Sequence, residues 1–414
     1  MHILVISQYF WPENFRINDL VSDFVERGHL VTVLTGVPNY PEGRVFDDYR
    51  KNPSAFLSYL GARVIRVPMT TRGSGAISLL LNYFTYALSA SLLGSWRLRR
   101  ESIDVIFVYE PSPVTVGIPG ALMRRLLGAP LVFWVLDLWP ETLKAVGVIQ
   151  SRSGLGLVAL LVRWIYRRCD LILAQSKSFI PQIRAYSDLS KRVEYFPSWA
   201  ESLFGAGFEA SAAPEVPSQS GAFTVMFAGN IGEAQDFPSI LNAAELLSVS
   251  HPHIRWIIVG DGRLGDWVSQ EVKRRNLESN VFLLGRFPVE RMPSFFRSAD
   301  ALLVTLKSEP IFAMTIPGKL QSYLASGKPI VAMLDGEGAR LLQESGAGIA
   351  APSGDAAKLA AAVVSVSEMP EPERALMGRN GAELYAQEFE RNTLLDRLEL
   401  WMKQLAVNYQ ADRE

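Results

Sequence analysis

A proline–glycine–lysine triplet, Pro317, Gly318 and Lys319, predicts a binding site for a phosphorylated ligand. Pro317 and Gly318 are typical of a helix start, and Gly327 marks the helix end. The first backbone N–H groups of a helix lack partners within the helix and attract anions. A lysine in the first turn opposes the helix dipole, so a bound anion explains Lys319 better than the alternative, a solvated helix start. We expect this helix start and Lys319 to hold a diphosphate.

Two glycine-containing turns, Ala228–Gly232 and Val259–Gly265, follow apolar runs. Glycine lets a nucleotide approach the backbone closely, and the second turn contains the string G-x-G-x-x-G. This string follows the second strand of its series, and no acidic residue ends the next strand, which argues against NAD. A plain tight turn is the alternative interpretation. The candidate ligand-binding residues are Gly229, Asn230, Gly260, Asp261, Gly262 and Arg286.

The first half of the chain offers a second set of polar residues. Asn14 and Arg16 begin a helical pattern after the first apolar run, where helix amides and Arg16 could hold a phosphate. Asp137 is a lone carboxylate within the aromatic stretch Phe133–Trp139. Because a buried carboxylate must be paired or functional, Asp137 is a candidate catalytic residue. Hydrogen bonding to ligand hydroxyl groups and capping of the next helix both remain open.

Short apolar runs alternate with helical patterns along the whole chain. Runs rich in Val, Ile and Leu on both faces are typical of parallel strands that helices cover. The alternation predicts an α/β fold with doubly wound sheets, which bind ligands at the carboxyl ends of their strands. The predicted strands are residues 3–7, 30–35, 63–67, 105–109, 131–135, 171–174, 193–196, 224–228, 256–259, 281–284, 301–305, 330–333 and 348–350.

The charge distribution divides the chain of 414 residues into two halves. Residues 1–200 hold 22 basic and 15 acidic side chains, a net charge of +7, whereas the remainder carries −8. A basic half favours an anionic partner, which could be nucleic acid, a phosphorylated ligand or a membrane surface, and chance asymmetry is the alternative. We predict two domains, 1–204 and 222–385, joined by a small-residue linker, 205–221. Residues 386–414 are expected to form an amphipathic C-terminal helix that packs back towards the first domain.

An uncharged, largely apolar stretch at residues 73–96 ends in the basic cluster Arg97, Arg99 and Arg100. Residues 155–165 have the same character and end in arginines. Such stretches fit attachment to a membrane interface, a helix packed on a sheet, or a membrane-spanning helix, and these interpretations remain open. One cysteine excludes a disulfide framework and favours a reduced compartment, and four histidines leave little material for a transition-metal site.

Taken together, these motifs resemble the retaining glycosyltransferase family 4, and they occur in the order found in that family. The resemblance implies the GT-B fold, in which two Rossmann-like domains face an interdomain cleft. It implies an acceptor-binding first domain, a UDP-sugar-binding second domain, retention at the anomeric carbon, and neither metal nor cofactor. The matching segments are residues 8–16 with 27–29, 136–141, 228–232, 259–262 and 319–329.

Residues 316–329 resemble a branch that includes N-acetyl-L-fucosamine transferases of bacterial O-antigen and capsule assembly. This branch implies an N-acetylated 6-deoxy amino sugar on UDP, a polyprenyl-diphosphate-linked saccharide acceptor, and peripheral attachment to the anionic inner face of the cytoplasmic membrane. Nucleic acid is not an expected partner. The expected catalytic residues are Lys319, Asp137 and Glu309. The expected donor-binding residues are Asn14, Arg16, Gly229, Asn230, Gly260, Asp261, Gly262, Arg286, Pro317, Gly318, Lys319, Gln321 and Ser322.

The sequence departs from the family at several of its usual ligand-binding positions. The second glutamate of the family's E-x7-E pair falls near Ser322, and the first falls near Ala313 or Met314, so Glu309 is the candidate substitute. Leu136 stands where many members have histidine, and residues 233 and 235 lack the usual Arg and Lys. The alternatives are a UDP-sugar 2-epimerase on the same fold, an NAD oxidoreductase, and a non-catalytic nucleotide-sugar-binding partner.

Overall fold

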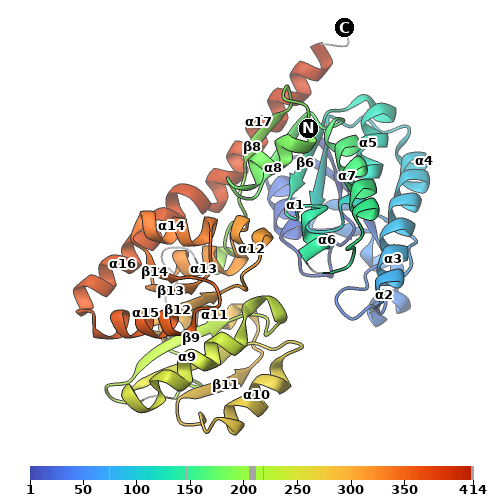
Figure 1. Ribbon diagram of the computed structural model, residues 1–414. Coiled ribbons are helices and arrows are strands. Elements are labelled where there is room, and N and C mark those ends of the chain that lie inside the picture. Colours follow the sequence, from blue (N-terminus) through green and yellow to red (C-terminus); the bar gives the residue numbers. More distant parts are fainter. Residues whose placement is uncertain (74, 146, 205–210, 218, 412–414) are drawn as a thin grey trace. The chain divides into compact units, whose positions relative to one another are not determined.

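The computed structural model describes residues 1–73, 75–145, 147–204, 211–217 and 219–411, and it divides into two compact α/β units. The first unit comprises residues 1–196 and 395–414, and the second comprises residues 197–394 (Figure 1). Every strand predicted from the sequence is present within two residues of its expected limits. Two Rossmann-like units are therefore built from the apolar runs that the sequence predicted.

The first unit is built on one eight-stranded sheet. Its strands are β1 (His2–Ile6), β2 (Leu30–Gly36), β3 (Ser58–Tyr59), β4 (Ala62–Val67), β5 (Val105–Glu110), β6 (Leu131–Val135), β7 (Leu171–Ala174) and β8 (Arg192–Tyr195). They lie in the order β3-β4-β2-β1-β5-β6-β7-β8, and all pairs are parallel except β3 with β4. The direction of winding changes between β1 and β5, so the loops after these two strands meet at a switch point.

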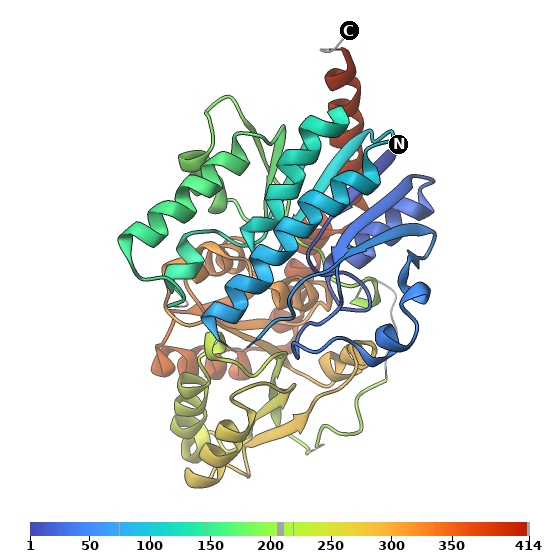
Figure 2. The same cartoon turned by 90° about the vertical axis from the view of Figure 1, so that its right-hand side faces the viewer.

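Helices cover both faces of this sheet. On one face, α5 contacts both the α3–η2 stretch and α7, so these helices lie side by side (Figure 2). The helices of the first unit are α1 (Arg16–Glu26), α2 (Asp47–Lys51), η1 (Pro53–Phe56), α3 (Ala76–Ser89), η2 (Ala90–Gly94), α4 (Ser95–Leu98), η3 (Val114–Val116), α5 (Gly117–Met123), η4 (Arg124–Gly128), α6 (Glu141–Ala145), α7 (Arg152–Tyr166), α8 (Phe179–Tyr186) and the end of α17 (Arg391–Ala411).

The second unit is built on a six-stranded parallel sheet. Its strands are β9 (Phe223–Ala228), β10 (Ile254–Val259), β11 (Val281–Gly285), β12 (Ala301–Thr305), β13 (Ile330–Met333) and β14 (Gly348–Ala351). Their order, β11-β10-β9-β12-β13-β14, is the 3-2-1-4-5-6 order of dinucleotide-binding folds. The switch point of this sheet lies between β9 and β12, and therefore not beside the glycine-rich string that follows β10.

The helices of the second unit enclose an apolar core centred on β9 and β10, which includes Phe227, Trp256 and Phe237. The helices are η5 (Ser202–Phe204), η6 (Glu233–Gln235), α9 (Phe237–Ser250), α10 (Gly265–Arg274), η7 (Val289–Arg291), α11 (Met292–Arg297), α12 (Pro310–Met314), α13 (Gly318–Ala325), α14 (Glu337–Ser345), α15 (Ala356–Glu368), α16 (Glu371–Leu384), η8 (Tyr385–Phe389) and the start of α17.

The boundary between the units precedes the predicted boundary at residue 204. Trp199 and Phe204 are buried, and the ring of Phe204 stacks on Phe296 with centroids 5.2 Å apart, so this segment belongs to the second unit. Residues 205–210 and 218 of the predicted linker lie outside the described residues. Its described part is anchored rather than free, because Glu215 pairs with Arg291 at 2.9 Å.

The end of α17 returns to the first unit. Its acidic residues meet α1, where Arg27 pairs with Glu399 at 3.0 Å and His29 contacts Glu399 at 2.9 Å. Leu395, Leu398 and Met402 are fully buried, so an apolar stripe lies beside these polar contacts. The last helix is therefore part of the first unit's core.

We predict that Leu398→Ala lowers the free energy of unfolding of the first unit by about 2–5 kcal/mol, because truncation of a buried leucine leaves a cavity. Leu400→Ala on the same helix is the matched control, since Leu400 is 54% exposed. Urea unfolding followed by circular dichroism measures both changes. Equal effects of the two substitutions would contradict the placement of this helix.

Candidate active site

Helix α13 is fixed to the switch point of the second unit by a tyrosine hydroxyl. The hydroxyl of Tyr323 accepts a hydrogen bond from the backbone N–H of Ala228 at 2.9 Å and donates one to its carbonyl oxygen at 3.2 Å. Burial raises the pKa of Tyr323, so the hydroxyl stays protonated. The start of α13 is thereby held against the carboxyl end of β9.

Lys319 lies in the first turn of this helix, and its Nζ is buried. The amine lies 3.6 Å from the centroid of the Phe227 ring, and no hydrogen-bond acceptor reaches it within the part of the chain that the structure describes. Burial lowers the pKa of Lys319 from 10.5 to about 7. An unpaired buried amine is costly, so the site is poised to receive an anion that would hydrogen-bond to Lys319.

The glycines after β9 and β10 are explained first by contact between the two loops. Gly260 has a φ of 144°, and a Cβ there would lie 1.9 Å from the carbonyl oxygen of Gly229. A Cβ on Gly262 would lie 2.4 Å from the carbonyl oxygen of Ile231. The backbone N–H of Ile231 in turn donates to Asp261 O at 2.9 Å. The G-x-G-x-x-G string therefore permits backbone-to-backbone packing, whether or not a nucleotide also approaches it.

The structure brings Gly229 close to Lys319, because a Cβ on Gly229 would lie 3.1 Å from Lys319 Nζ. Asn230 is exposed in the same loop, and Asp261 Oδ1 accepts from the backbone N–H of Gly262 at 2.7 Å. Arg286 is exposed directly after β11. These predicted residues therefore share the carboxyl edge of the sheet, and Lys319 and Gly229 are in contact.

Most of the remaining predicted residues of this unit lie at the start of α13, and Glu309 lies before α12. Pro317 is the N-cap of α13, Gly318 begins the helix and is exposed, and Glu309 is exposed before α12. Gln321 is 1% exposed, and its amide nitrogen faces the carbonyl oxygens of Pro317 and Gly318 at 3.0 and 2.7 Å when oriented as a donor. The Gln321 side chain thus holds the helix start.

A carboxylate that the sequence analysis did not select reaches Ser322. The hydroxyl of Ser322 donates to Glu201 Oε2 at 3.2 Å, and both residues belong to the second unit. Glu201 lies 121 residues earlier in the chain, so no spacing motif could have joined the two. A carboxylate therefore lies beside position 322, although the residue at that position is a serine.

In the first unit, the loop after β1 is held by Glu13. Its carboxylate accepts hydrogen bonds from the backbone N–H groups of Asn39 and Tyr40, both at 2.7 Å, which tie the loop after β2 to it. Arg16 begins α1, and its backbone N–H donates to the hydroxyl of Tyr109 on β5. The predicted residues Asn14 and Arg16 therefore lie at the switch point of their own sheet, where Asn14 is exposed.

Asp137 follows β6, and its carboxylate is engaged within the loop. Trp139 Nε1 donates to Oδ2 at 3.1 Å and Thr142 Oγ1 donates to Oδ1 at 2.5 Å, so Asp137 organises the turn into α6. Burial raises the pKa of Asp137, and these hydrogen bonds oppose the rise. The geometry thus favours a positioning role within the loop over a free base.

Glu110 at the end of β5 is a second buried carboxyl that the sequence analysis did not select. It is fully buried, its Oε2 accepts from the backbone N–H of Asp137 at 3.3 Å, and its pKa is raised well above 4.5 by burial and by the nearby Asp137 carboxylate. Its only sequence signal was a charged residue ending an apolar run. A fully buried carboxyl and a partly exposed one are therefore neighbours at the carboxyl ends of β5 and β6.

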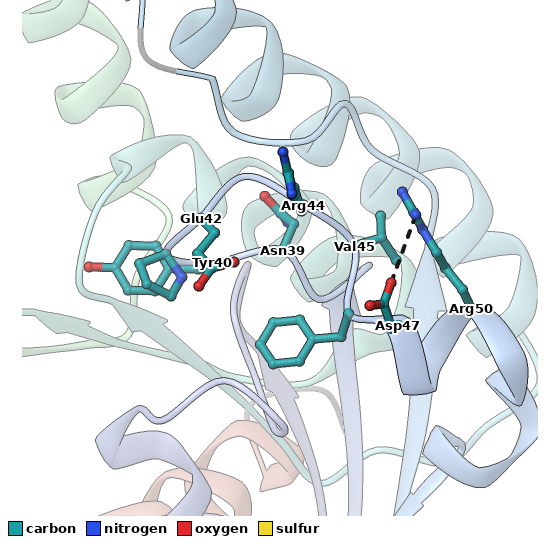
Figure 3. A pocket seen from close by; sticks show the side chains of 9 residues that line it. Asn39, Tyr40, Glu42, Arg44, Val45, Asp47 and Arg50 are labelled. Atoms are coloured by element: carbon teal, nitrogen blue, oxygen red, sulfur yellow. Dashed lines mark ion pairs between the residues drawn. The ribbon is translucent and has the colours of Figure 1, made fainter.

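A hollow of about 460 Å³ lies in the loop between β2 and α2 (Figure 3). The side chains that line it include aromatic rings and groups that can form hydrogen bonds. Arg50 forms an ion pair with Asp47, with 4.0 Å between nitrogen and oxygen. The ring of Tyr40 also lies against Phe15 with centroids 5.1 Å apart, which places the hollow beside the loop after β1. The lining residues are Asn39, Tyr40, Pro41, Glu42, Arg44, Val45, Phe46, Asp47 and Arg50.

Metal-ligating side chains are not grouped in the described residues. No set of three or more His, Cys, Asp or Glu side chains there could hold a metal ion.

Two family models match the two units in order. Residues 14–199 match the model described as a glycosyl transferase 4-like domain, and residues 222–368 match the model described as glycosyl transferases group 1. Together these two regions include the residues at both switch points. Both matching models describe glycosyl transferases, and neither describes an NAD-dependent enzyme.

Similar proteins of known sequence and structure agree with these models. WbjE of Pseudomonas aeruginosa, provisionally named a glycosyltransferase, is 28% identical over 66% of this chain and 68% of its own length. WcaI of Escherichia coli (strain K12) is provisionally named a colanic acid biosynthesis glycosyl transferase. It is 26% identical over 79% of this chain and 82% of its own length. The crystal structure of Anabaena HepE in complex with UDP covers 98% of this chain and 100% of its own, with a TM-score of 0.69 and 14% identity.

We predict that, above pH 7, Lys319 takes up a proton when an anion binds to it. With a pKa of about 7, Lys319 is mostly neutral at pH 8 in the free protein, and a bound diphosphate favours its charged form. Calorimetry with UDP at pH 8, in buffers of different ionisation enthalpy, should show uptake of about one proton, and affinity should fall as the pH rises. The uptake should vanish at pH 5.5 and in Lys319→Met. Proton uptake that persists in Lys319→Met would assign it to another group.

Proposed function

Because this chain is a glycosyltransferase of the retaining family 4 with the GT-B fold, we propose that it transfers a sugar from UDP to a lipid-linked saccharide during synthesis of a bacterial surface polysaccharide. The named role of WcaI in colanic acid biosynthesis supports the polysaccharide part of this proposal. The UDP bound by HepE supports the donor part.

The observation that carries the donor proposal is the unpaired, buried amine of Lys319 at the switch point of the second unit. An anion at this place would meet the Lys319 ammonium and the first N–H groups of α13 together. A diphosphate supplies two negative groups and thus uses both. A side chain at Gly229 would crowd the amine, because its Cβ would lie 3.1 Å from Lys319 Nζ.

The reaction that these groups support is substitution at the anomeric carbon of the donor sugar. The bond from that carbon to the diphosphate oxygen breaks, and a bond to the acceptor oxygen forms on the same face. The acceptor's proton passes to the departing phosphate, so no carboxylate nucleophile is required. Lys319 and the α13 amides stabilise the negative charge that develops on the leaving diphosphate.

Glu201 is the group that we assign to the ribose of UDP. Ser322 holds its carboxylate near the helix that presents Lys319, and carboxylate oxygens accept hydrogen bonds from ribose hydroxyls. Resemblance to the family places a glutamate at position 322, and Glu201 supplies the same chemical group from another segment. Glu309, exposed before α12, remains the candidate for contact with the donor sugar.

The acceptor saccharide is assigned to the hollow between β2 and α2. Aromatic rings such as Tyr40 and Phe46 suit the apolar faces of sugar rings, and Arg44 and Glu42 suit their hydroxyl groups. Since the acceptor is carried by a polyprenyl diphosphate, the proposed place of action is the inner face of the cytoplasmic membrane.

The donor sugar that we propose is an N-acetylated 6-deoxy amino sugar such as N-acetyl-L-fucosamine. Its support is the resemblance of residues 316–329 to transferases of that sugar. A panel of UDP-sugars tested with short-chain lipid-linked acceptors, with release of UDP as the signal, identifies the donor. Release of UDP with a different sugar alone would refute this specificity while leaving the transferase proposal intact.

We predict that Lys319→Ala lowers turnover by about 10²–10³-fold, as expected for the loss of one group that stabilises a developing anion. The fold should be retained, which circular dichroism checks. Lys358→Ala, at an exposed lysine of α15, is the matched control and should leave turnover unchanged. Unchanged turnover in Lys319→Ala would refute the diphosphate assignment.

We predict that Glu201→Gln weakens UDP binding by about tenfold or more, the usual range for the loss of a charged hydrogen-bond acceptor. Binding of inorganic diphosphate should not change, because it carries no ribose. Glu278→Gln, an exposed glutamate of the same unit, is the control. If Glu201→Gln weakened both ligands equally, its effect would be on the helix rather than on the ribose.

A further inference from the structure

The α3–η2–α4 stretch turns several polar and small residues inward and most of its large apolar residues outward. Asn82 is fully buried and hydrogen-bonds to Gln8 at 2.7 Å, and Tyr86 is fully buried and donates to the Leu34 carbonyl oxygen at 3.2 Å. The outer residues follow one another at intervals of one, three or four positions, and they are large and apolar. Those exposed by 39–77% are Ile77, Leu80, Leu81, Phe84, Leu88, Leu92, Leu93 and Trp96.

Two neighbouring helical segments continue this apolar surface. On α5 and η4, Leu122 and Leu126 are 36% and 58% exposed, and on α7 the exposed residues are Leu157, Leu160 and Trp164. Because α5 contacts both of its neighbours, the three segments form one face of the first unit (Figure 2). Thirteen of the 22 exposed large hydrophobic residues in the described chain lie on them, so the concentration is local. We call this set the outer helical face.

Arginines border the outer helical face where its helices end. Arg99 lies over the ring of Trp96 at 4.7 Å, and Arg168 lies over Trp164 at 4.1 Å. Arg97, Arg99 and Arg100 line one open hollow beside Trp96, and four arginines of η4 and the α7 end line another of about 600 Å³. Tryptophan paired with arginine beside an apolar surface is the arrangement that suits the boundary between lipid tails and anionic headgroups.

The helical stretch Ile77–Leu98 is long and apolar enough to cross a membrane, and no other helix in the described residues meets that test. Only 39% of the apolar window is buried, however, and its inner side hydrogen-bonds to the loop after β1 through Asn82 and to β2 through Tyr86. Crossing the membrane would break the buried hydrogen bonds of Asn82 and Tyr86. A helix that lies along the interface keeps these bonds and buries its outer side in lipid.

We propose that the outer helical face docks flat on an anionic lipid membrane, with its leucines and Phe84 among the acyl chains and its arginines at the headgroups. A soluble partner surface would need matching carboxylates and apolar groups, whereas an anionic bilayer supplies both over any area. This inference rests on the proposed function only for the reason to dock, which is a lipid-borne acceptor. It does not depend on the donor site in the second unit.

The test is flotation of the full chain with vesicles of phosphatidylcholine, with and without phosphatidylglycerol. The triple variant Leu81→Gln/Phe84→Gln/Leu88→Gln should lose at least about tenfold in partitioning, because its apolar contact is removed. The variant Arg99→Gln/Arg100→Gln/Arg125→Gln should lose about fivefold per arginine at low salt, and only on anionic vesicles. The matched control is Leu246→Gln/Val249→Gln on α9, whose side chains are 56% and 90% exposed.

Circular dichroism and UDP affinity should be unchanged in all of these variants, which separates docking from folding and from the donor site. Wild-type chain that stays in the soluble fraction on anionic vesicles at low salt would overturn the proposal. So would a dimer in sedimentation that the triple variant abolishes and vesicles do not compete, since the face would then join two copies. Vesicle binding without transfer to any acceptor would instead count against the proposed function alone.

Discussion

The hydrogen bonds between the Tyr323 hydroxyl and the backbone of Ala228 set the geometry of the second unit's site. One side chain satisfies both the N–H and the carbonyl oxygen at the end of β9, where the sheet can no longer do so. The first turn of α13 is thereby fixed, and Lys319 lies over Phe227. The pKa of Lys319 is lowered there because its amine is buried, and no hydrogen-bond acceptor of the described residues reaches it.

The sequence predicted the strands well because parallel strands buried on both faces are apolar throughout. Among the strands of the described residues, β3 alone was not predicted, since it consists of two residues and pairs at the sheet edge. The site was predicted where a local pattern existed, as for Lys319 and the turn at Gly229. It was missed where the contact depends on distant segments, as for Glu201 with Ser322 and for Glu110 with Asp137.

The glycine-rich string matches a nucleotide-binding motif, but contact between two loops already explains its glycines. Its strand is one position away from the switch point, and its glycines accommodate the neighbouring loop. The apolar stretch at 73–96 gives the opposite lesson. Hydropathy alone left a core helix, an interfacial helix and a spanning helix open, and the buried hydrogen bonds of Asn82 and Tyr86 argue against the spanning helix.

The second unit is a single continuous segment inserted into the first, because the chain leaves the first unit after Phe196 and re-enters it at Leu395. During synthesis from the amino terminus, the second unit can therefore finish folding while the first still lacks the end of α17. Until the last residues emerge from the ribosome, the surface that receives Leu395, Leu398 and Met402 has no cover. The first unit can therefore complete its core only after the whole inserted segment has been translated.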